Sequence, residues 1–135
     1  MEMKTYNGCD SILEMRALSF ESRVSRKATL EILDWALNKL NNDSLTKIRD
    51  NKFWATETNI DKKVRFDIVL YIMDDEYNAI GIRRNYYIDA DEAKQGIREI
   101  DIEIYLNAND KPEAIKKAID LIKKFRKFIE FLDTL

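Results

Sequence analysis

The chain has 135 residues, with 23 Lys and Arg against 25 Asp and Glu, one cysteine and no histidine. The lack of histidine excludes Ser–His and Cys–His nucleophile systems and zinc sites that depend on histidine ligands. A hydrophobic content of 45% with a net charge of −2 is typical of a folded domain and argues against disorder. We therefore expect one domain over residues 1–135, a non-catalytic role, and neither metal nor cofactor.

Compartment and membrane contact follow from the same composition. Cys9 is the single cysteine, so no intramolecular disulfide can form, which favours a reducing compartment. No apolar run approaches the roughly 18 residues of a membrane span, and residues 1–6 lack the apolar core of a secretion signal. These features predict a cytoplasmic protein without membrane contact.

The first two elements lie in the N-terminal third of the chain. Ser11 followed by Glu14 resembles a capping box, which favours a helix over residues 11–22, although an edge strand would also suit this apolar stretch. Residues 28–40 predict a helix more clearly, because leucines recur there at steps of three and four. These leucines are Leu30, Leu33, Leu37 and Leu40.

Four strands are predicted in the middle of the chain. Apolar residues alternate strictly over residues 64–73 and 99–106, the period of a strand with one buried face. Residues 79–88, rich in Ile and Tyr, and residues 52–58, with Phe, Trp and Thr, complete the set. Short links between consecutive strands favour an antiparallel meander. The predicted fold is α+β, with a sheet of about four antiparallel strands flanked by N-terminal helices and a long C-terminal amphipathic helix.

The C-terminal helix is predicted to begin after Asp110, a capping acid followed by Pro112. Its apolar face is wider than a coiled-coil seam and suits packing on a sheet. The helix is also long enough to overhang a sheet of four strands. Its far end is therefore a candidate surface for self-association or partner contact, formed by Phe128, Phe131, Leu132 and Leu135.

Basic residues are concentrated on this helix. Residues 111–135 carry seven Lys and Arg against four acids, whereas residues 57–110 carry thirteen acids against seven bases. We interpret the basic face as a solvated helix surface whose lysines attract acids of the strands. Contact with nucleic acid through these lysines is the alternative, and it is disfavoured by a pI near 5.3.

Acidic residues point outward from the predicted strands. Asp101 and Glu103 lie on one strand and Asp67 on another, an arrangement that could hold a divalent cation. Arginines in neighbouring strands offer cross-strand pairing instead, and we favour that interpretation. These arginines are Arg65, Arg83 and Arg84.

The best candidate site combines tyrosine and arginine on the outward face of the sheet. Both residue types are enriched in binding hot spots, and tyrosine also stacks on nucleobases. The candidate residues are Arg83, Arg84, Tyr86 and Tyr87 within residues 81–87, together with Tyr71 and Tyr105. Helix 28–40 could instead cover part of this face, and Trp35 and Trp54 are expected in the core or at its edge.

These observations lead to three functional hypotheses. The first is a non-catalytic interaction protein, such as a small inhibitor, an immunity protein or a phage-encoded antagonist, that binds a protein partner through the Tyr/Arg face. The second is a protein that sequesters a nucleotide-like small molecule on the same face. The third is nucleic-acid binding through the Lys-rich helix. Homo-oligomer formation through the end of that helix stays open.

Overall fold

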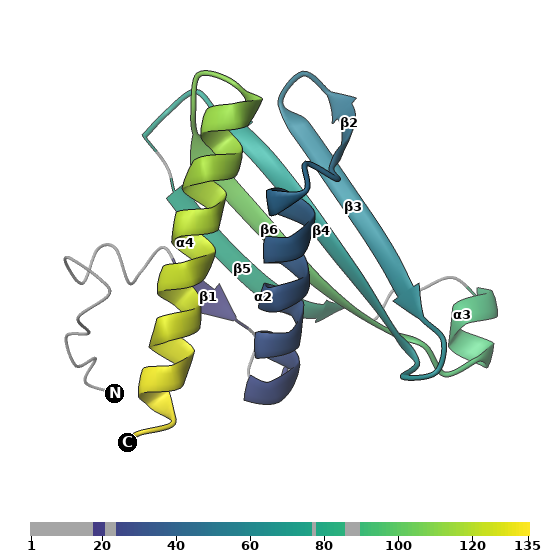
Figure 1. The fold of residues 1–135 in the computed structure, drawn as a ribbon. Helices are drawn as coiled ribbons and strands as arrows, with labels where there is room; N and C mark the ends of the chain where they lie inside the picture. Colours follow the sequence, from purple (N-terminus) through teal and green to yellow (C-terminus); the bar gives the residue numbers. More distant parts are fainter. Residues whose placement is uncertain (1–17, 21–23, 77, 86–89) are drawn as a thin grey trace.

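A computed structural model describes residues 18–20, 24–76, 78–85 and 90–135 (Figure 1). The elements in chain order are β1 (Leu18–Phe20), α2 (Arg26–Asn41), β2 (Thr46–Arg49), β3 (Lys52–Asn59), β4 (Val64–Met73), β5 (Asn78–Asn85), α3 (Ala90–Lys94), β6 (Arg98–Asn107) and α4 (Lys111–Leu132). The fold is α+β, as expected. Helices α2 and α4 lie side by side across the same face of one sheet (Figure 1).

The sheet is mixed and has the strand order β1-β5-β6-β4-β3-β2. Strands β2, β3 and β4 form an antiparallel meander, but β6 inserts between β4 and β5 and runs parallel to β4. The predicted four-stranded, wholly antiparallel meander is therefore wrong. Alternation in a strand specifies which residues face the core, but it does not specify the neighbouring strand, and here the last strand takes the central position.

The N-terminal prediction also needs correction. Residues 18–20 form a short strand that pairs in parallel with residues 80–82 of β5, so the edge-strand alternative is right there and the helix is wrong. The rest of the predicted element, residues 11–17, lies outside the described residues. Strand β2 and helix α3 were not predicted. The four residues of β2 are all exposed and α3 has five residues, so neither carries an apolar period.

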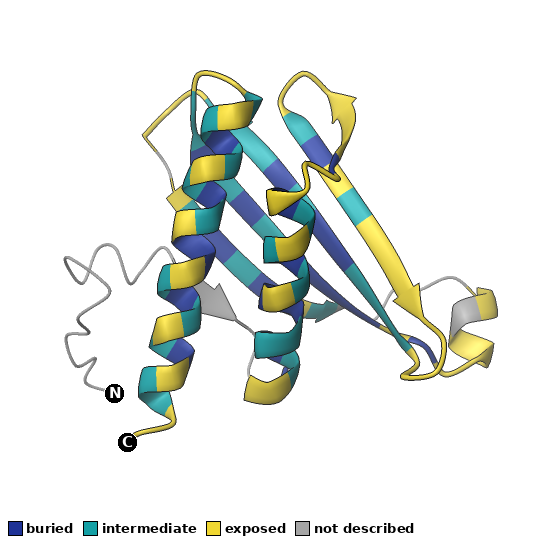
Figure 2. Cartoon of the chain, viewed as in Figure 1, coloured by how far each residue is buried: buried dark blue, intermediate teal, exposed yellow. Residues whose placement is uncertain are grey.

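Helix α2 begins where the sequence provides a cap and then buries one face. The Ser25 hydroxyl accepts a hydrogen bond from the Ala28 N–H at 3.1 Å, which satisfies one free donor of the first turn. Buried side chains of both helices and of the sheet form a single core, visible as dark stripes in Figure 2. Its largest fully buried members are Ile32, Leu33, Leu40, Ile68, Leu70, Ile80, Ile82, Ile102, Ile104, Leu106, Ile122 and Phe125.

Helix α4 starts with the predicted cap. The Asp110 carboxylate accepts from the Glu113 N–H at 2.9 Å, and the Glu113 carboxylate accepts from the Asn109 N–H at 3.1 Å. These two bonds form a reciprocal cap of the capping-box kind, and Pro112 lies in the first turn. The hydrogen bond from Asn109 and the proximity of Lys117 lower the pKa of Glu113, which keeps this carboxylate ionised.

The end of α4 is less open than its sequence suggests. Phe128 and Leu132 pack against the core, and Arg26 at the start of α2 forms an ion pair with Asp133 at 2.5 Å. Phe131 is half-buried, whereas Leu135 is 68% exposed. Of the predicted association surface, Leu135 alone is fully presented to solvent. Self-association through this end stays a prediction.

The cap of α4 gives a direct test of the helix start. The variant Asp110→Ala removes the acceptor of the Glu113 N–H, and we expect the free energy of unfolding to fall by about 1 kcal/mol. Urea unfolding followed by circular dichroism measures this change. The control Asp120→Ala removes a carboxylate from the exposed middle of the same helix and should alter stability by less than about 0.5 kcal/mol. Equal losses in both variants would contradict the capping role.

Candidate functional site

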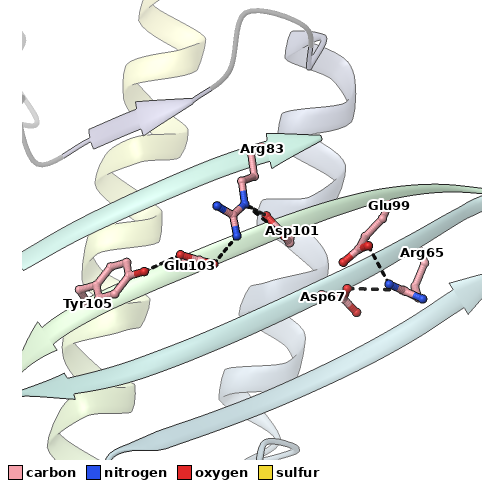
Figure 3. Close-up of polar contacts among 7 residues, drawn as sticks. All are labelled: Arg65, Asp67, Arg83, Glu99, Asp101, Glu103 and Tyr105. Carbon is pink, nitrogen blue, oxygen red and sulfur yellow. Dashed lines mark hydrogen bonds and ion pairs between the residues drawn. The ribbon is translucent and has the colours of Figure 1, made fainter. Parts of the chain in front are cut away.

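The sheet face turned away from α2 and α4 carries most of the candidate residues. Since Phe66, Ile68 and Leu70 point toward the helices, the alternate residues of β4 and its neighbours point the other way. Figure 3 shows this side, with the two helices behind the sheet. We call it the polar face. Its main members are Lys52, Trp54, Arg65, Asp67, Val69, Tyr71, Met73, Arg83, Glu99, Asp101, Glu103 and Tyr105.

Arg83 is the centre of one group on the polar face. Its Nε lies 3.0 Å from Asp101 Oδ1 and its Nη2 lies 2.6 Å from Glu103 Oε1. The Tyr105 hydroxyl donates to the other oxygen of Glu103 at 2.5 Å. Two strands thus supply a continuous chain of polar contacts from Arg83 to Tyr105 (Figure 3).

The charges in this group stabilise one another. Burial raises the pKa of Asp101, and the Arg83 guanidinium opposes that rise. Burial also acts to lower the pKa of Arg83, but the carboxylates of Asp101 and Glu103 outweigh it and raise that pKa. Burial and the hydrogen bond to Glu103 raise the pKa of Tyr105, so its hydroxyl stays a donor at physiological pH. The group is therefore held in one arrangement by its hydrogen bonds and ion pairs.

Arg65 is the centre of a second, more deeply buried group. Its Nη2 lies 2.7 Å from Glu99 Oε2 and its Nε lies 3.4 Å from Asp67 Oδ2. Asp67 and Glu99 are only 9% and 5% exposed, and Asp67 Oδ1 has no hydrogen-bond partner in the described part of the chain. Burial raises the pKa of Glu99 to about 7, and the neighbouring Asp67 adds to the rise while Arg65 opposes it.

Aromatic side chains cover the neighbouring part of the polar face. The rings of Tyr71 and Tyr105 stack with centroids 4.7 Å apart and an interplanar angle of 3°. Lys52 Nζ lies 5.3 Å from the centroid of the Tyr71 ring. Trp54 is opposite Val69 in the sheet and is 38% exposed. The polar face thus joins an aromatic surface to a network of paired charges.

The structure brings together some of the predicted site residues and separates others. Tyr71, Tyr105 and Arg83 meet on the polar face. Arg84 follows the buried Ile82 by two residues and is opposite Ile100, so it lies on the helix side of β5. Tyr86 and Tyr87 lie outside the described residues. Whether the predicted residues bind a partner stays a prediction.

The structure excludes one alternative for this face and corrects one expectation. Helix α2 packs on the opposite side of the sheet, so it does not cover the polar face (Figure 1). Trp54 belongs to the polar face and not to the core, whereas Trp35 is partly buried at the edge of the core. The sequence showed that Trp54 and Lys52 point to the same face, because they are two residues apart in one strand. Their position beside Val69 and Tyr71 depends on the register across the turn at residues 60–63.

The acidic side chains are paired as expected. Cross-strand pairing is confirmed for Asp101 and Glu103, which pair with Arg83. Asp67 pairs with Arg65 of its own strand, and Arg84 lies on the other side of the sheet. Within the described residues, no group of three carboxylate, thiol or imidazole side chains is arranged to hold a metal ion. The acids of the polar face pair with two arginines, Arg65 and Arg83.

The basic side chains of α4 have other partners than those expected. Lys117 donates to the carbonyl of Asn107 at 2.7 Å and pairs with Glu113, and Arg126 pairs with Asp34 of α2. Most acids of the strands lie on the other side of the sheet, and Glu57 of β3, which lies on the helix side, pairs with Lys39 of α2. The expectation that the lysines of α4 attract acids of the strands is therefore wrong for Lys111 and Lys117, whose carboxylate partners are Asp43 and Glu113.

Comparison with protein family models, with curated proteins and with solved structures gave no match. In the described ranges, no helix combines the length and the apolar character needed to cross a bilayer.

The buried Glu99 predicts a specific pH dependence of stability. Because its pKa rises from 4.5 to about 7 on folding, the folded state holds the proton more tightly than the unfolded state. Its contribution to stability is therefore complete below about pH 4.5 and is lost as the pH rises through 7. In Glu99→Gln, we expect urea unfolding to show a smaller loss of stability across this range than in the wild type.

The matched control is Glu76→Gln, which neutralises an exposed carboxylate away from the polar face. Its stability should follow the pH dependence of the wild type. Parallel curves for the wild type and Glu99→Gln would show that Glu99 does not titrate in this range.

Proposed function

We propose that this chain is a non-catalytic interaction protein that binds a protein partner through the polar face. The observation that carries the proposal is the fixed set of Tyr71, Tyr105 and Arg83, connected through Glu103, with Trp54 presented beside it. Tyrosine, tryptophan and arginine dominate the residues on which protein interfaces depend for their binding energy.

The order within this set favours binding because it lowers the entropic cost of association. Arg83 is 56% exposed at its side chain, yet two carboxylates hold its guanidinium. Tyr71 and Tyr105 hold each other in a stack. A partner would therefore meet side chains that already have their bound conformations, and little rotamer freedom would be lost.

A protein partner suits this face better than a nucleotide does. Among the charged members of the polar face, Lys52, Arg65 and Arg83 are outnumbered by four acids. A phosphate group at Arg83 would lie beside Asp101 and Glu103, where repulsion opposes it. The tyrosine rings already stack on each other, so a base would have to separate them or bind at their rims.

The narrower roles predicted from the sequence, an inhibitor, an immunity protein or a phage antagonist, remain specific forms of this proposal. Each would require a partner whose surface accepts aromatic side chains together with one arginine. Such a partner surface would carry acceptor groups facing Arg83 and an apolar area facing Trp54.

The test compares two neighbouring arginines that point to opposite faces. Affinity capture with the wild type identifies a stoichiometric protein partner, whose affinity is then measured by calorimetry for each variant. We expect Trp54→Ala and Arg83→Ala to weaken binding by about 30-fold or more each, the loss typical of hot-spot residues. Arg84→Ala is the matched control and should bind like the wild type.

Thermal unfolding of each variant separates loss of the surface from loss of the fold. Unchanged affinity in both Trp54→Ala and Arg83→Ala, with folded protein, would refute the proposed surface. A rise in melting temperature with a nucleotide, abolished by Arg83→Ala, would favour the nucleotide-binding alternative instead.

A further inference from the structure

A pocket of about 210 Å³ lies on the other side of the sheet, between α2, the turn before β4 and the first residues of β4 and β6. This is roughly the volume of seven water molecules in the liquid. Its lining residues are Ala28, Glu31, Lys62, Lys63, Val64, Phe66, Arg98 and Ile100. The pocket is separate from the polar face, because Phe66 and Ile100 point toward the helices.

The pocket has an apolar floor. Ala28, Val64, Phe66 and Ile100 supply it, and Ile100 belongs to the buried core. The ring of Phe66 packs against the ring of Trp35, with the ring centroids 5.7 Å apart. The floor is therefore continuous with packed side chains. A floor of this kind accepts an aromatic ring or a short aliphatic group.

The rim of the pocket is cationic. Lys62, Lys63 and Arg98 surround it, with Glu31 as the one acid among the lining residues. None of these four side chains forms an ion pair within 4.0 Å in the part of the chain that the structure describes. Other basic residues, such as Arg83 and Lys111, pair with a carboxylate. The rim therefore keeps a positive charge that the fold does not neutralise.

The turn that carries the two lysines is fixed on β6. The Arg98 N–H donates to the Lys63 carbonyl at 2.9 Å, and the Asn59 side chain accepts from the Lys62 N–H at 3.0 Å. Lys63 has φ of 54°, in the left-handed region that non-glycine residues seldom adopt. These contacts fix the backbone of the turn beside the start of β6, and Lys62, Lys63 and Arg98 all line the same pocket.

Helix α2 adds to the positive potential. Ala28 lies in its first turn, next to the positive end of the helix dipole, and that turn contains no acid. Lys27 lies in that turn, whereas Arg26 is paired with Asp133. An anion bound above Ala28 would thus interact with the helix end as well as with the rim.

We propose that this pocket binds a small amphipathic anion, an apolar group that carries one carboxylate or phosphate. The apolar group lies against Phe66 and Ile100, and the acid group lies between Lys62, Lys63 and Arg98. The pocket volume suits a single small ring or a short chain. This inference does not depend on the proposed protein partner, which would contact the opposite face of the sheet.

The first experiment measures binding of phenylacetate, with the neutral phenylacetamide as the matched ligand. In a Trp54→Phe background, Trp35 is the single tryptophan and reports on the pocket through its contact with Phe66. We expect saturable binding of phenylacetate with a dissociation constant on the order of 1 mM or lower. The dissociation constant of the amide should be higher by about tenfold or more. Phenyl phosphate measures the preference between the two acid groups.

The second experiment assigns the binding to the pocket. Lys62 and Arg98 are exposed, so Lys62→Gln and Arg98→Gln should fold normally and weaken phenylacetate binding by about tenfold each. Ala28→Leu fills the pocket and should abolish binding. Lys123→Gln, which removes an exposed charge from α4, is the control and should leave the affinity unchanged.

Three results would overturn the proposal. The first is no saturation with ~10 mM phenylacetate, ten times the weakest dissociation constant expected. The second is equal binding of acid and amide, which would show that the cationic rim plays no part. The third is an equal loss in Lys123→Gln and Arg98→Gln, which would indicate a general effect of net charge. The two charge variants decide the question if Ala28→Leu fails to fold, as judged by circular dichroism.

Discussion

The parallel pairing of β4 with β6 is the constraint from which both proposed surfaces follow. In this register Ile68 is opposite Ile102 and Leu70 is opposite Ile104, and all four side chains are fully buried beneath the helices. A slip of one residue would turn acids such as Asp101 toward the core and isoleucines toward the other side. Burial of these side chains on the helix side therefore fixes the register, and this register sets which residues of β4 and β6 lie next to each other on the polar face.

The same register creates an electrostatic problem that the arginines solve. It places Asp67 opposite Asp101, and like charges facing each other destabilise a sheet. Arg65 from β4 and Arg83 from β5 lie on either side of these acids and pair with them. The arginine that pairs with Asp101, Arg83, also contacts Glu103, the carboxylate that accepts from the Tyr105 hydroxyl.

The Arg65 group is not fully compensated. Asp67 Oδ1 is buried without a hydrogen-bond partner among the described residues, and one guanidinium lies between two buried carboxylates. An apolar pair there would cost less desolvation. The polar face thus departs from the most stable solution, as binding surfaces often do.

The sequence predicted the individual elements better than their arrangement. Strand β4 was predicted with its observed bounds, and the capped start of α4 was predicted from Asp110, because alternation and capping are local signals. The order of the strands is not local. The position of β6 depends on which two strands bury its isoleucines best, and β1 and β2 are too short to show a period.

The candidate site was predicted in part for the same reason. The alternation of side chains along each strand was enough to place Tyr71, Tyr105 and Arg83 on one face. Applied strictly, the same alternation would have assigned Arg84 to the opposite face from Arg83. Trp54 required the register across the β3–β4 turn, which no local pattern gives. The pocket beneath α2 required the packing of that helix against β4 and β6, so only the folded structure reveals it.

Strands β4 and β6 contribute residues to both proposed sites at alternate positions. The two sites differ in whether their basic side chains are paired with carboxylates of the chain. On the polar face, arginines are paired with carboxylates of the chain, which suits a surface that must stay ordered and must not attract free anions. Arg98, which precedes Glu99 at the start of β6, faces the other side and forms no such pair in the described structure. Charge neutralised within the fold favours docking of a protein, whereas charge left uncompensated around an apolar floor favours capture of an anion. The alternation that builds the core thereby gives one sheet two surfaces of different chemistry.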